Sequence, residues 1–206
     1  MPEFPKAREQ TDKIAPAVLI AGVGNVLLGD DGFGVEVANR LAARPELPEW
    51  VKVIETGIGG MSLIQELMQG FEALIIVDAY ARGGEPGQIY FLEPILPDLS
   101  GLAPSQLRDY FADTHYATPI RALSLLAQVA KQPKILRILG CEPADLDEMK
   151  IGLSNEVENA VEIAVGLLVK MLAEYKEKGL GSVSGQDIVQ QIQQWSPNVK
   201  RKKSLK

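Results

Sequence analysis

The chain has 206 residues, of which 46% are hydrophobic and 23% charged, close to the average for globular proteins. This length fits one domain with a core of ordinary size. The formal net charge of −6 argues against nucleic acid as the main partner, because a surface that follows phosphates needs clustered Lys and Arg. The single cysteine, Cys141, excludes an internal disulfide framework and a thiolate zinc cluster.

Neither a secretory leader nor a membrane-spanning helix is predicted. Residues 1–16 are polar, with scattered charges. The longest apolar stretch, residues 160–173, is broken by Glu162, Gly166 and Lys170. It therefore does not reach the roughly 20 apolar residues that a membrane helix needs. We expect a soluble cytoplasmic protein with no membrane partner.

Apolar runs and helical spacing alternate along the chain. In chain order, the predicted elements are a strand at 17–22, a helix at 33–43, a strand at 50–55, a helix at 61–68, strands at 73–77 and 88–92, a helix at 118–130, a strand at 134–139 and a helix at 154–178. The turn-rich segment 82–87 is too short for a parallel crossover, so the strand at 88–92 is predicted to be antiparallel to its neighbour. The pattern predicts a three-layer α/β/α sandwich around a twisted, mostly parallel mixed sheet of about five strands.

The last helix has clear start and stop signals. Ser154 is the expected N-cap, and Glu156 and Glu158 in the first turn favour the helix dipole. Lysines followed by Gly179 are typical of a helix end. We therefore predict a flexible segment over residues 1–16, a single α/β domain over 17–179, and a flexible basic tail over 180–206.

Acidic residues follow two of the predicted strands. The loop after the first strand carries Asp30 and Asp31, and the third strand stops at Asp78. Ligands of an open α/β sheet bind outside the carboxyl ends of its strands, so these acids should meet at one edge. His115 lies in a loop just ahead of a predicted helix and can fold over that edge.

The glycine-rich loop carries the sequence GVGNVLLGDDGFG, which partly matches three other kinds of site. A dinucleotide fingerprint would need glycine where Leu27 stands. A phosphate-binding loop would need Lys and Ser or Thr in place of Asp30 and Asp31, and two carboxylates repel phosphate. A receiver domain would have its acidic pair directly after the strand, and a lysine after the strand at 134–139. The loop therefore favours a cation or a cationic group.

Two aspartates and a neutral imidazole form a mixed oxygen–nitrogen set suited to nickel, zinc or manganese. Three protein ligands would leave positions open for water or substrate, as in reactive metal sites. Each residue also has an ordinary structural interpretation. Asp31 can cap the helix that begins near Phe33. Asp78 can simply end a strand, and His115 can be an ordinary loop histidine. The residues alone leave both interpretations open.

A family resemblance favours the functional interpretation. From about residue 18 to about residue 178, the chain resembles the maturation endopeptidases of nickel–iron hydrogenases in the order and spacing of its motifs. The motifs are GVGNVLLGDDGFGV, TGIGGMSLI, LIIVDAY, DTHYATP, GCEPADL and IGLSNEV. By position in these motifs, the site residues are Asp31, Asp78 and His115. Many relatives have Glu at the position of Asp31. The Asp of this chain keeps the negative charge, but its side chain is shorter by about one methylene.

The resemblance implies an activity, a partner and a metal. The activity is removal of the C-terminal extension from a hydrogenase large-subunit precursor after nickel insertion. Nickel would come from the precursor rather than belong to the enzyme, and zinc or cadmium could substitute for it. Asp31, Asp78 and His115 would recognise the metal and support catalysis. The alternative function is a non-catalytic nickel-binding chaperone or sensor for hydrogenase assembly.

Several other residues have weaker claims. Cys141 follows a buried strand and has the character of a small core residue, although with His115 it could form a thiol protease. Asp30 is expected to hold the loop or the site residues in position without itself being a ligand. Glycines 57, 59 and 60 either expose backbone amides to a substrate or only turn the chain. The following acids form a loop whose expected role is solvation: Glu142, Asp145, Asp147 and Glu148.

Overall fold

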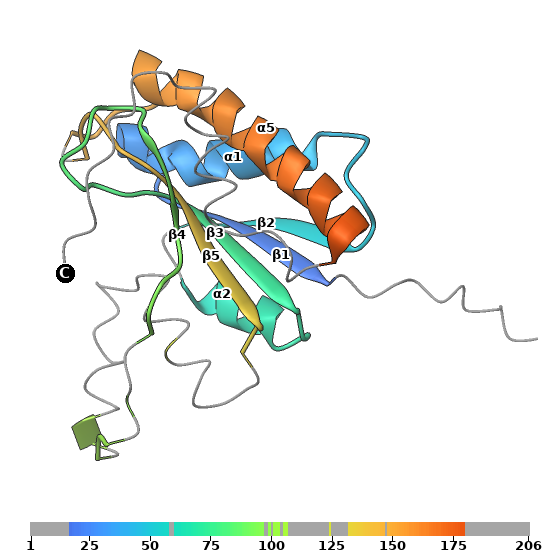
Figure 1. The fold of residues 1–206 in the computed structure, drawn as a ribbon. Coiled ribbons are helices and arrows are strands. Elements are labelled where there is room, and N and C mark those ends of the chain that lie inside the picture. Colours follow the sequence, from blue (N-terminus) through green and yellow to red (C-terminus); the bar gives the residue numbers. More distant parts are fainter. Residues whose placement is uncertain are drawn as a thin grey trace, which may run out of the picture.

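A five-stranded mixed sheet forms the centre of the protein (Figure 1). The computed structural model describes residues 17–57, 60–96, 132–146 and 148–179, with isolated positions at 99, 101–103, 105–106 and 124. The strands are β1 (Val18–Val23), β2 (Val51–Gly57), β3 (Ala73–Ala79), β4 (Ile89–Leu92) and β5 (Ile135–Cys141). Their order across the sheet is β2-β1-β3-β5-β4.

All neighbouring strands are parallel except β4, which runs antiparallel to β5. Both the mostly parallel sheet and its one antiparallel strand agree with the prediction from sequence. The short 82–87 segment returns the chain beside β5, where Ile89 pairs with Cys141. The carboxyl ends of β1, β2, β3 and β5 therefore share one edge of the sheet, which we call the carboxyl edge.

Helices cover the two faces of the sheet (Figure 1). Helices α1 (Phe33–Ala42) and α5 (Asn155–Lys178) lie on one face, and α2 (Gly60–Leu67) lies on the other. Arg40 of α1 joins the first pair by ion pairs to Glu158 and Glu162 of α5, the latter at 2.6 Å. In the described ranges no helix is long and apolar enough to cross a membrane.

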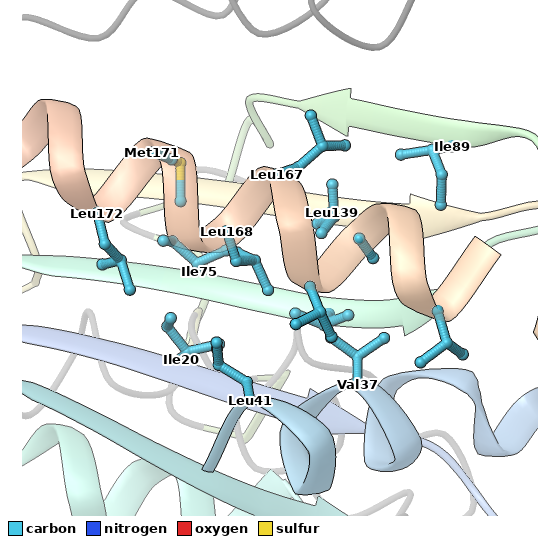
Figure 2. Close-up of a cluster of buried hydrophobic side chains, with 14 of the residues drawn as sticks. Ile20, Val37, Leu41, Ile75, Ile89, Leu139, Leu167, Leu168, Met171 and Leu172 are labelled. Atoms are coloured by element: carbon cyan, nitrogen blue, oxygen red, sulfur yellow. The ribbon is translucent and has the colours of Figure 1, made fainter. Parts of the chain in front are cut away.

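Strand alternation divides the core into two clusters. Ile20 and Ile75 point toward α1 and α5, whereas Leu19 and Leu74 belong to the cluster under α2. Figure 2 shows Leu168 and Leu172 of α5 packed over the first face. Because β1 and residues 73–77 of β3 are buried on both faces, these stretches are continuously apolar, as the pattern predicted.

The ends of α5 match the sequence signals. The hydroxyl of Ser154 accepts a hydrogen bond from the amide of Val157 at 3.4 Å. At the other end, Gly179 has φ +85°, which suits glycine, and its amide donates to the carbonyl of Tyr175. The predicted segments 1–16 and 180–206 lie outside the described residues, as does the helix at 118–130 apart from Ser124, so the domain limits stay predictions.

Candidate active site

The sheet changes direction between β1 and β3. From β1 the chain moves to β2 on one side, and it then returns to place β3 on the other side. Such a switch point is where open α/β sheets bind their ligands. Asp31 follows β1 in a short 3-10 turn, η1 (Gly29–Gly32), and Asp78 lies near the end of β3. Because Gly22 is opposite Val77, Asp78 lies one residue beyond, at the carboxyl edge.

Glycines bring the η1 turn close to the strand ends. Gly24 has φ +139°, and a Cβ on it would lie 1.7 Å from the carbonyl oxygen of Asp31. A Cβ on Gly34 would lie 2.1 Å from the carbonyl oxygen of Val77. Backbone atoms occupy both places, so a side chain at either position would push the loop away. The glycine spacing in the first motif thus holds Asp31 near β3.

The side chain of Asp31 is directed back into its own loop. Its Oδ2 atom accepts a hydrogen bond from the backbone amide of Asn25 at 2.7 Å. The alternative that Asp31 caps the following helix is wrong. Gly32 occupies the N-cap of α1, and no side chain caps it. The η1 turn places Asp31 one residue too early for that role.

Asp78 carries the most informative electrostatics of the site. Burial first, and then the negative charge of Asp31, raise the pKa of Asp78 to about 7, against a smaller opposing effect of the Ala79 amide. The two carboxyl groups are therefore close enough to repel each other. A bound cation would relieve this repulsion, because it favours the ionised form of both acids.

The adjacent acid, Asp30, has a different task. Its side chain is 3% exposed. It accepts hydrogen bonds from the amide of Ser154 at 2.6 Å, from the Ser154 hydroxyl at 2.9 Å and from the amide of Ala144 at 2.8 Å. Asp30 thus fastens the η1 turn to the loop before α5, as the expected supporting role requires.

The remaining predicted ligand, His115, lies outside the described residues. Within the described ranges, no group of three or more His, Cys, Asp or Glu side chains is arranged to hold a metal ion. Of the three predicted ligands, the structure places Asp31 and Asp78 close enough for their charges to interact. These two carboxylates supply hard oxygen donors of the kind that divalent metals accept.

Comparison with known proteins identifies the family. The family model described as hydrogenase maturation protease matches residues 35–171. The chain is 34% identical to the hydrogenase 2 maturation protease of Escherichia coli over 170 residues, which cover 81% of this chain and 94% of that one. It is 30% identical to the hydrogenase expression/formation protein HupD of Bradyrhizobium diazoefficiens, covering 77% and 79% of the two chains.

A solved structure agrees with these matches. The hydrogenase maturating endopeptidase HybD from E. coli aligns with a TM-score of 0.60 and 31% identity, over 79% of this chain and 93% of that one. The chain belongs to the hydrogenase maturation protease family. It is therefore a hydrolase of peptide bonds with the fold of HybD-like proteases.

Cys141 is poorly suited to be the nucleophile of this protease. It is the last residue of β5, and its side chain has no exposure to solvent. Burial first, and then the charges of Asp30 and Glu142, raise the pKa of its thiol to about 12. Because the thiolate is the reactive form, a thiol with this pKa is inert at neutral pH. Cys141 is a core residue, as its position after an apolar run suggested.

The burial of Glu142 contradicts the role expected for the acidic loop. It is only 4% exposed, so a role in solvation is wrong for this residue. Its carboxylate accepts hydrogen bonds from the amides of Arg82 and Gly83 and from the hydroxyl of Tyr90. Burial would raise the pKa of Glu142, but these hydrogen bonds together lower it. Asp145 and Glu148 are exposed, and Asp147 lies outside the described residues.

The contacts of Glu142 give the loop after Asp78 a fixed shape. The guanidinium of Arg82, in the same turn, lies over the ring of Tyr90, 5.5 Å from its centroid. Sequence reasoning missed Glu142 because its partners come from β4 and from a turn about 60 residues earlier. A local signal was present in the turn, since two adjacent glycines leave their amides open to a buried acceptor.

Proposed function

We propose that this protease removes the C-terminal extension of a nickel–iron hydrogenase large-subunit precursor after nickel has been inserted. We also propose that Asp31, Asp78 and His115 recognise the nickel held by that precursor. The observation that supports the proposal best is the proximity of the two carboxyl groups at the switch point of the sheet, where burial and then the charge of Asp31 raise the pKa of Asp78. Such a pair is suited to receive a cation.

Nickel is part of the substrate in this proposal. The precursor's nickel would supply the positive charge that balances the paired carboxylates, and the histidine would add a nitrogen donor. Zinc or cadmium can replace nickel in such a donor set. Anchoring the metal also positions the polypeptide attached to it. A scissile bond held near the site gains from proximity, so a precursor without nickel would be a poor substrate.

The pKa of Asp78 also suits the chemistry of peptide hydrolysis. The pKa of Asp78 is about 7 in the free protein, and a bound cation would favour its ionised form, which is the form that acts as a general base. We propose that its carboxylate accepts a proton from the water that attacks the scissile carbonyl, and returns it to the leaving amine as the C–N bond breaks. Asp31, held by the Asn25 amide, stays in place to share the positive charge of the substrate.

Membership of a protease family favours this function over a nickel-binding chaperone or sensor. The two functions use the same ligands, so a cleavage assay separates them. Purified precursor, loaded with nickel or free of it, is incubated with the protein and followed by its mobility shift. We expect cleavage of the loaded precursor only. Binding without cleavage would support the chaperone instead.

Variants then test the site. Asp31→Asn, Asp78→Asn and His115→Ala should each reduce cleavage by orders of magnitude while circular dichroism stays unchanged, because residues that act as a unit lose function together. Glu85→Gln is the matched control, since Glu85 is an exposed acid in the turn after β3. Equal cleavage of nickel-free precursor would contradict metal recognition, and full activity of Asp78→Asn would contradict the site.

A further inference from the structure

Apolar side chains gather at the carboxyl edge beside the candidate site. Val26 and Leu27, in the loop before η1, are 51% and 49% exposed. Met149 and Ile151, in the loop before α5, are 78% and 83% exposed. We call these four residues the apolar rim. Large apolar side chains that cluster on a surface mark an interaction site more often than single ones do.

Backbone hydrogen bonds join the two halves of the apolar rim. Leu28 and Lys150 form a parallel bridge. The amide of Lys150 donates to the carbonyl of Leu27 at 3.0 Å, and the amide of Gly29 donates to the carbonyl of Lys150 at 2.6 Å. One parallel β-bridge thus joins the two segments of the rim, and both segments carry exposed apolar side chains.

The outer side of the segment at 149–151 is an open edge. In a parallel pair the polar groups of alternate residues face the partner, so those of Met149 and Ile151 face away from the segment at 27–29. In the part of the chain that the structure describes, the amides and carbonyls of these two residues have no hydrogen-bond partner. An open edge of this kind can accept an added strand.

The apolar rim is continuous with the candidate site. Asn25, next to Val26, donates its amide to the carboxylate of Asp31. A Cβ on Gly32, next to Asp31, would lie 3.3 Å from the Cα atom of Val26. The rim therefore borders the loop that holds Asp31.

We propose that the apolar rim is the docking site for an extended apolar segment of the substrate polypeptide, which pairs as an added strand with the edge at 149–151. The proposal rests on the proposed function, because it assumes that the substrate is a polypeptide brought to Asp31 and Asp78. Main-chain hydrogen bonds would hold the segment, and the apolar side chains of Met149 and Ile151 on that edge would select for apolar residues within it.

A second copy of this chain is the less suitable occupant. A stable protein interface involves about 20–30 residues on each side. The apolar rim offers four apolar side chains and one edge of three residues, which matches a single extended peptide. Its place beside the candidate site also matches a substrate segment, because a protease must bind the chain that it cuts.

The test compares two double variants in cleavage of nickel-loaded precursor. Met149→Asp with Ile151→Asp puts two charges on the rim. Met68→Asp with Ile95→Asp is the matched control, since these residues are 66% and 92% exposed and follow α2 and β4, at the opposite edge of the sheet. We expect the rim variant to raise KM at least tenfold with kcat changed less than twofold, and the control to change neither.

A second measurement works without cleavage. A benzophenone amino acid is placed at position 149 or 68 in the inactive Asp78→Asn protein, which is then irradiated with precursor. We expect cross-links to the precursor from position 149 only. An unchanged KM of the rim variant, equal cross-linking from both positions, or cross-links only between two copies of this chain would each overturn the docking proposal. Failure of the unaltered protein to cleave precursor would overturn the proposed function, while the cross-links still decide docking.

Discussion

The carboxylate of Asp30 accepts a hydrogen bond from the hydroxyl of Ser154 at 2.9 Å, and the same hydroxyl caps α5. One side chain thus ties the turn that carries Asp31 to the start of the longest described helix. A second oxygen of Asp30 accepts the Ser154 amide at 2.6 Å. The two neighbouring acids have separate tasks, because Asp30 turns inward and Asp31 reaches the edge beside Asp78.

Replacing Asp30 should therefore destabilise the fold. Asp30→Ala leaves the amides of Ser154 and Ala144 without their buried acceptor. We expect a loss of about 2–4 kcal/mol in the free energy of unfolding, because unsatisfied buried groups carry the full cost of desolvation. Urea denaturation measures this loss. Asp31→Ala is the matched comparison and should cost less than about 1 kcal/mol, so equal losses would contradict the division of tasks.

Asp78 should make stability depend on pH in a defined window. Its pKa is about 7 in the folded protein and near 4 in an unfolded chain. Below about pH 4 the carboxyl group is protonated in both states. As the pH rises from 4 to 7, the unfolded chain loses this proton first, so the free energy of unfolding falls. Above pH 7 the whole destabilisation, up to about 4 kcal/mol, persists.

The Asp78→Asn variant isolates this effect. Asn cannot ionise, so the variant should gain stability over the unaltered protein as the pH rises from 4 to 8. Thermal unfolding at several pH values measures the difference. In an Asp31→Asn background the gain should shrink, because the charge of Asp31 contributes to the raised pKa. A stability difference that does not vary with pH would contradict the electrostatic description of the site.

Cys141 should be dispensable for catalysis and resistant to alkylation. Its thiol is fully buried, and its pKa is raised to about 12, first of all by burial. We expect Cys141→Ser to keep its cleavage activity and the native protein to react with iodoacetamide only after unfolding. Mass spectrometry follows the modification. Rapid labelling of the folded protein together with loss of activity would restore the thiol-protease alternative.

The sequence predicted those features that depend on local pattern and strand direction. Continuous apolar runs identified β1 and β3 as strands buried on both faces. The rule for carboxyl ends of parallel strands then predicted that Asp31 and Asp78 would share an edge. Both inferences need only short-range periodicity and the handedness of crossovers, which the sequence carries directly.

Features that depend on distant partners were not predictable in this way. Glu142 lies in an acidic run that is typical of a solvated loop. It is nevertheless buried, and its carboxylate accepts hydrogen bonds from the amides of Arg82 and Gly83. The Asn25 amide that holds Asp31 depends on the shape of one turn. The sequence pattern also gave no reason to choose Ser154, 124 residues away, as the partner of Asp30. Such contacts depend on tertiary packing or on the exact shape of a turn, and neither can be read from local sequence periodicity.

Metal affinity tests the proposed donor set directly. Two carboxylates and one imidazole from separate segments give an incomplete coordination sphere, so the isolated protein should bind nickel, zinc or cadmium only moderately. His115 is the only histidine in the chain, and His115→Ala should weaken binding. Acidification should have the same effect, because the imidazole gains a proton near its ordinary pKa of about 6.5 and then cannot bind a metal. Calorimetry at pH 7.5 and pH 5.5 measures both effects, with Glu85→Gln as the control. Zinc should also shift the single imidazole resonance of the chain in NMR spectra. Unchanged affinity in His115→Ala would remove His115 from the site and leave the precursor's nickel to be recognised by Asp31 and Asp78 alone.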